Sequence, residues 1–115
     1  MTLRLAELDP EFIRIADAGL RGDGWAYGTQ AVAHLEEAQG ICFICPGCWR
    51  KSENTAHSIL CWFALRGVPD AVEPRARWVV SGGTGVDDLT IEPSVLLLTG
   101  CRWHGFVRDG EIVDA

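Results

Sequence analysis

The sequence predicts an α+β fold in which β structure dominates, namely an antiparallel, zinc-ribbon-like sheet preceded by one or two short helices. Residues 40–115 hold short apolar runs separated by glycine- and proline-containing turns, which is the pattern of strands. The first 39 residues instead carry helix start and stop signals. At 115 residues, we expect a single domain, with a helical N-terminal segment, 1–39, and a zinc-stapled β-region, 40–115.

Two helices are expected in the N-terminal segment. Asp9 is a favourable N-cap residue and Pro10 suits the first helical turn, so a short helix should begin there and end at Gly19. The glycine-rich residues 20–28 indicate a loop. Helix-favouring residues then run from Thr29 to Gly40, which predicts a second helix.

The rest of the chain indicates strands. Apolar runs predict strands at residues 41–45, 58–66, 77–81 and 95–99, and two more at 103–107 and 111–113. The last two flank Asp109-Gly110, a dipeptide that is a strong signal for a tight hairpin.

Cysteine and histidine spacing predicts one metal ion. Cys45 and Cys48 are separated by Pro-Gly, and Cys101 and His104 repeat the two-residue gap. Three thiolates and an imidazole complete a closed tetrahedron around a structural Zn²⁺. Cys42 and His57 are alternative ligands, because Cys42 makes a second C-x-x-C with Cys45 and His57 lies in a nearby polar turn. Otherwise Cys42, like Cys61, is expected to be a buried thiol.

Charge and hydropathy limit the partners. The net charge is −6, with 16 acidic against 10 basic residues, so nucleic acid is an unlikely partner and a protein is favoured. No apolar run reaches the ~18 residues of a membrane span. Acidic residues near the start argue against a signal peptide. We therefore expect a protein of the cytoplasm, where cysteines serve as thiols or metal ligands.

No nucleophile–base set stands out. Ser94 follows Pro93 without a glycine-rich elbow, and no histidine is assigned to activate it. The hypothesis is therefore a non-enzymatic zinc-binding module that binds a protein. One alternative is a zinc-dependent hydrolase with an open metal site and a carboxylate such as Asp87 or Glu92 facing the ion. Another is a single-stranded nucleic-acid binder that uses Trp49, Trp103 and nearby arginines.

Several motifs resemble a known family. The ordered elements are Cys-Pro-Gly-Cys at 45–48, Trp78 with Ser81-Gly82, Leu-Thr-Ile-Glu-Pro-Ser-Val at 89–95, and the Cys-Arg-Trp-His-Gly segment from 101. Over residues 40–113 the chain resembles a family of small phage and prophage proteins of unknown function. They often carry the label ammonia monooxygenase, and related domains occur beside bacterial ubiquitin-like conjugation genes.

The resemblance implies a zinc-bound β-domain with ligand roles on Cys45, Cys48, Cys101 and His104, and no established activity. The monooxygenase label conflicts with such a site, since that chemistry needs a redox metal with an open position. Together with the acidic composition, the resemblance favours a phage or mobile-element protein that inhibits a host factor.

Overall fold

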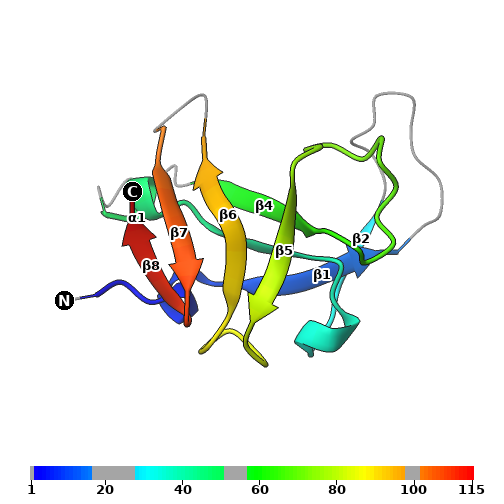
Figure 1. Ribbon diagram of the computed structural model, residues 1–115, viewed down its shortest axis with the longest axis horizontal. Helices are drawn as coiled ribbons and strands as arrows, with labels where there is room; N and C mark the ends of the chain where they lie inside the picture. The colour runs from blue at the N-terminus through cyan, green and yellow to red at the C-terminus, as the bar shows by residue number, and fades with distance from the viewer. Residues whose placement is uncertain (1, 17–27, 51–56, 98–101) are drawn as a thin grey trace.

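The fold is a single sheet of eight strands in the order β2-β1-β3-β4-β5-β6-β7-β8 (Figure 1). The computed structural model describes residues 2–16, 28–50, 57–97 and 102–115. The strands are β1 Glu11–Ile15, β2 Thr29–Ala31, β3 Gly40–Ile44, β4 Ser58–Phe63, β5 Arg77–Gly82, β6 Thr90–Leu96, β7 His104–Arg108 and β8 Glu111–Asp114. Three short helices, η1 Leu5–Leu8, η2 Leu35–Glu37 and α1 Pro46–Arg50, complete the described elements.

The prediction of a β-dominated, mostly antiparallel sheet is confirmed. Every neighbouring pair of strands is antiparallel except β4 and β5, which run parallel. All six predicted strands are present, although β6 starts at Thr90, earlier than the predicted residue 95. The prediction of a single domain stays a prediction.

The first predicted helix is wrong. Asp9 adopts a left-handed conformation (φ 50°) that ends η1, and residues from Glu11 form β1. The reason is long-range pairing, because β1 is hydrogen-bonded to β3 with Phe12 opposite Ile41. Phe12 and Ile13 are both buried, so the sheet, rather than local propensity, decides the conformation.

The second predicted helix is also wrong. Its residues form β2 and the single turn η2 instead. Both ends of the segment are tied to β1, since Val32 N donates to Phe12 O (2.9 Å) and Gln39 N donates to Ile13 O (2.8 Å). The Gln39 side chain also accepts a hydrogen bond from Ile15 N (2.8 Å). These contacts with β1 replace the i→i−4 bonds of a helix. The predicted loop at 20–28 lies outside the described residues except for Gly28.

The sheet bends around its core. In Figure 1, β5 and β6 cross in front of β1 and β4, and one buried cluster draws side chains from both halves of the sheet. The free edge of β8 is covered by the N-terminal segment, because Ile112 N donates to Leu3 O (2.8 Å) and Leu5 N to Gly110 O (2.8 Å). The largest fully buried members of the cluster are Phe43, Phe63, Leu5, Leu8, Ile41, Leu89, Ile91, Val95 and Val107.

The predicted Asp-Gly hairpin is present between β7 and β8. Asp109 (φ 49°) and Gly110 (φ 72°) both have positive φ, as a two-residue type I′ turn requires. Gly110 also packs against the chain between β5 and β6, where a Cβ atom would overlap the carbonyl oxygen of Asp87. Any larger residue at position 110 therefore meets both backbone strain and a clash.

We expect Gly110→Ala to lower the free energy of unfolding by about 2 kcal/mol or more, through strain at positive φ and the clash with Asp87. Urea denaturation followed by circular dichroism measures this. Gly85→Ala is the matched control, because a Cβ there has nothing within 4 Å. Equal stability of the two variants would contradict the account.

Candidate functional site

Two cysteines and a histidine form a compact group of potential metal ligands. The ligand atoms of Cys45, Cys48 and His57 all lie within 4.8 Å of one another, and Cys48 Sγ is 3.2 Å from His57 Nδ1. Donor atoms around a tetrahedral zinc ion are about 3.5–3.8 Å apart, as follows from its usual bond lengths. The group therefore has the donor types and the spacing to hold a metal ion.

The pairing of β3 with β4 brings this group together. Ile44 lies opposite Ser58, and Cys45 N donates to His57 O (2.8 Å), so the residues that follow β3 and precede β4 are neighbours. Helix α1 then turns Cys48 back toward Cys45, with Trp49 N donating to Cys45 O (2.9 Å). Cys45 and Cys48 are buried while His57 is exposed.

The other predicted ligands have different positions. Cys101 lies outside the described residues. His104 begins β7, where its Nε2 lies against a serine hydroxyl rather than in the cysteine group. Cys42 is partly buried in a second apolar cluster with Trp62, and burial together with the Glu11 carboxylate raises the pKa of its thiol. Burial also raises the pKa of the Cys61 thiol, so both stay protonated, as expected for core cysteines.

Ser94 and His104 lie in direct contact through their side chains. Ser94 Oγ lies 2.9 Å from His104 Nε2, which is within hydrogen-bond distance. His104 is exposed and Ser94 is partly exposed, so a substrate can reach both. Among the described residues, Ser94 is the hydrogen-bond partner recorded for this imidazole.

A bulge in β6 presents the serine. Ile91 pairs with Val107 and Val95 pairs with Gly105, so residues 92–94 of β6 lie opposite the single residue Phe106 of β7. Pro93 has no N–H to contribute to the ladder, which is why such residues occur at bulges. From inside the fold the Trp78 indole N–H contacts Ser94 O at 3.4 Å. The strand therefore departs from regular pairing at the serine.

Comparison with known proteins gives one result. A family model described as "Bacterial ubiquitination-like system serine protease (BubE)" matches residues 23–115, which is most of the chain and includes all the residues of both groups. The chain belongs to the BubE family. No curated protein and no solved structure matches it significantly.

Membership of the BubE family overturns the predicted function. A non-enzymatic interaction module was expected, whereas the family is described as a serine protease. The sequence analysis assigned no histidine to Ser94, whereas the structure places His104 Nε2 2.9 Å from its hydroxyl oxygen. The expected link to bacterial ubiquitin-like systems is confirmed at the level of the family, while phage origin stays a prediction.

A hairpin argument could have found the pair in this BubE sequence. The strands predicted at 95–99 and 103–107 are consecutive, and consecutive strands usually pair. Antiparallel pairing in this region places Leu96 opposite His104, so a residue shortly before Leu96 must lie near the histidine. Ser94 was the available hydroxyl.

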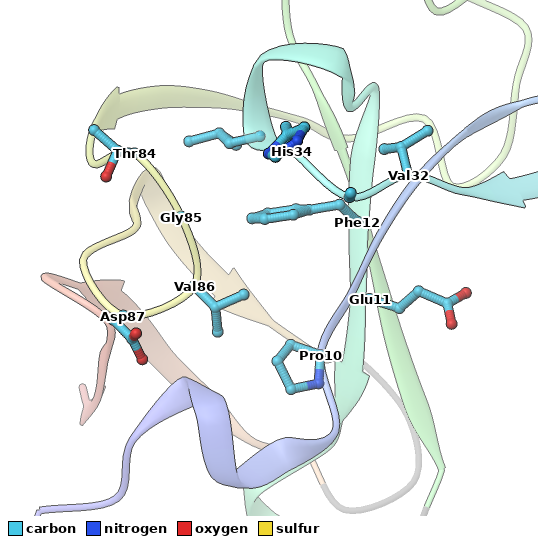
Figure 2. Close-up of a pocket in the computed structure, with 11 residues that line it drawn as sticks. Pro10, Glu11, Phe12, Val32, His34, Thr84, Gly85, Val86 and Asp87 are labelled. Carbon is cyan, nitrogen blue, oxygen red and sulfur yellow. The ribbon is translucent and has the colours of Figure 1, made fainter.

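One cavity of this protein lies away from the serine. It has a volume of about 470 Å³ and is lined by the chain around Phe12, His34 and Val86 (Figure 2). It adjoins the turn between β5 and β6, whereas Ser94 and His104 lie toward the opposite end of β6. The Thr84 hydroxyl in its lining donates to Asp88 (3.1 Å). Hydrogen bonds from Thr84 N and Gly85 N hold the pKa of that carboxyl below its usual range.

The structure also places the residues named for the two alternative functions, a zinc hydrolase and a nucleic-acid binder. Asp87 lines the cavity, and its carbonyl accepts a hydrogen bond from Arg4 (2.9 Å). Glu92 is exposed on the β6 bulge, Trp49 is 41% exposed, and Trp103 is buried. In the part of the chain that the structure describes, no helix has the length and apolar character needed to cross a membrane.

We expect His57→Ala to weaken metal binding by at least about tenfold. Removing a residue that only supports a metal ligand already costs about this much affinity, and removing a ligand costs at least as much. Titration with Co²⁺, followed by thiolate-to-metal absorption, measures the affinity. Cys42→Ala is the matched control, since this thiol lies on β3, shortly before Cys45, but packs against the second apolar cluster. Equal loss in both variants would contradict a site built on His57.

Proposed function

We propose that this protein is a serine protease in which Ser94 is the nucleophile and His104 is the general base. The observation that carries the proposal is the 2.9 Å separation of Ser94 Oγ and His104 Nε2. The description of the BubE family as a serine protease supports it.

The pair supplies every proton transfer that peptide hydrolysis needs. His104 Nε2 takes the hydroxyl proton while Ser94 Oγ bonds to the carbonyl carbon of the substrate. The C–N bond then breaks, and the protonated imidazole gives its proton to the leaving amine. A water molecule attacks the resulting ester, His104 takes its proton and returns it to Ser94 Oγ, and the new carboxyl product leaves.

We propose a Ser–His pair rather than a triad. The contacts of the described residues give the His104 imidazole a serine partner, while the nearby carboxylate of Asp114 binds Arg50 and Trp103 instead. An acid normally fixes the tautomer and orientation of the histidine. Here the orientation must come from the strand that carries it.

We propose that the cysteine group holds a structural zinc ion. Cys45, Cys48 and His57 offer the soft sulfur and nitrogen donors that zinc prefers, and Cys101, predicted from the sequence, is the proposed fourth ligand. Such an ion would fix the start of α1 to the start of β4. The region would then resemble a zinc ribbon in having a zinc ion that links its strand ends, while its strand topology differs.

We propose a protein of the bacterial ubiquitination-like system as the substrate. The family description names that system. The pair lies on an open face of the sheet, where His104 is exposed and its cross-strand neighbour Leu96 is 54% exposed. Such a face suits an extended polypeptide better than a small enclosed ligand. The cytoplasm remains the proposed compartment.

Ser94→Ala should remove hydrolysis of a ubiquitin-like substrate protein and labelling by a fluorophosphonate probe, by at least about 10³-fold, because the nucleophile is lost. Substrate cleavage is followed by gel electrophoresis and labelling by mass spectrometry. Ser81→Ala is the matched control, since Ser81 is an exposed serine on the neighbouring strand β5.

His104→Ala should cause a similar loss, with His34→Ala as its control at the distant cavity. Labelling that persists in Ser94→Ala would show that another residue is the nucleophile. Labelling unaffected by His104→Ala would remove the proposed base.

A further inference from the structure

Three elements meet at the carboxylate of Asp114. This residue ends β8, opposite Gly105 of β7. Arg50 Nη1 donates to both Asp114 Oδ1 and Oδ2 at 2.7 Å, and the Trp103 indole N–H donates to Oδ1 at 2.9 Å. Arg50 belongs to α1, which also carries Cys48, and Trp103 directly precedes His104. In Figure 1, α1 and the end of β8 lie beside each other.

The Trp103 side chain is closely fitted beneath the backbone of β7. It is 7% exposed, and a Cβ atom at Gly105 would collide with its ring. Its carbonyl accepts a hydrogen bond from Leu97 N at 3.0 Å, and the carbonyl of His104 accepts one from Ala115 N at 3.1 Å. The backbone on both sides of the histidine is thus held by β8 and by the end of β6.

The imidazole of His104 makes fewer contacts than the backbone on either side of it. It is exposed, and the Phe106 ring is 6.4 Å away between centroids. Its place relative to Ser94 therefore depends on where the backbone holds residue 104. That backbone position depends in turn on the indole beneath it.

We propose that Asp114 is a positioning residue, which fixes Trp103 to Arg50 and thereby sets the distance between His104 Nε2 and Ser94 Oγ. This inference rests on the proposed function. It makes α1, the helix of the metal-ligand group, a support for the protease pair.

The alternative is an ordinary surface ion pair. Arg50 and Asp114 are 39% and 54% exposed, and exposed pairs of this kind add little to stability. The buried indole as a third partner separates this contact from such pairs. Its hydrogen bond and that of Arg50 hold the pKa of the Asp114 carboxyl below its usual range, so the acceptor stays ionised at neutral pH. A positioning role should appear in the reactivity of Ser94 and leave the melting temperature nearly unchanged.

The test compares fluorophosphonate labelling rates of the full chain and its variants. We expect Asp114→Ala to lower the maximal labelling rate about tenfold while half-saturation by the probe changes little, because misplacing a catalytic group slows the reaction rather than binding. Asp114→Asn should lose less, since its amide oxygen still accepts the Trp103 N–H. Arg50→Met combined with Asp114→Ala should be no worse than Asp114→Ala alone, because both changes break one contact.

Glu111→Ala is the matched control. Glu111 lies on the same strand, and its ion pair with Arg4 (3.6 Å) has similar exposure, 43% and 44%. It should label within about twofold of the parent chain, as expected for loss of an exposed ion pair. Parent-like labelling of Asp114→Ala, or an equal loss in Glu111→Ala, would overturn the inference.

A second measurement does not depend on catalysis. The imidazole ¹H–¹⁵N resonances of His104 should shift in Asp114→Ala and stay in place in Glu111→Ala. If the parent chain is not labelled at Ser94, the proposed function fails, and these resonances alone decide the inference. Unchanged His104 resonances in Asp114→Ala would then refute it.

Discussion

The pairing of β6 with β7 is the constraint on which the rest of the site depends. Three residues of β6 lie opposite one residue of β7, so the chain must leave the regular ladder at Ser94. Regular pairing returns at Val95, and this brings Leu96 opposite His104. The serine hydroxyl and the imidazole therefore meet at 2.9 Å without any long-range element to bring them together. A hairpin with an irregular strand is enough to build the pair.

Strand pairing also builds the metal-ligand group. Cys45 and His57 are twelve positions apart in sequence, yet the β3–β4 register makes them neighbours through the 2.8 Å bond from Cys45 N to His57 O. One turn of helix then adds Cys48. Both groups thus lie where an antiparallel pair of strands ends or is interrupted. The Arg50–Asp114 contact joins them, since Arg50 follows the cysteine group and Asp114 pairs beside the histidine.

These relations explain which parts of the sequence were predictive. Apolar runs and the Asp109-Gly110 turn located β3 to β8 because their signals are local. The segments around Phe12 and Leu35 were mistaken for helices because their conformation comes from pairing with β1 and β3, which propensity does not register. Cys45 and Cys48, which the sequence predicted as ligands, lie together with a histidine in a group that could hold a metal ion. The two-residue gap before His104 resembles a second half-site, whereas the structure places His57, rather than His104, beside the two cysteines.

The sequence around Ser94 lacks the glycine-rich elbow by which a serine nucleophile is usually recognised. A glycine-rich elbow works because it places the serine on a sharp departure from a strand, with its hydroxyl clear of the sheet. Pro93 and the bulge around it achieve the same exposure in β6 by removing a ladder donor and adding residues. An elbow needs glycine because its backbone is strained, whereas a bulge needs only unequal strand lengths. In the proposed mechanism, the residues Glu-Pro-Ser in a strand followed by the histidine of the next strand take the place of the elbow, and the likeness lies in geometry rather than in sequence.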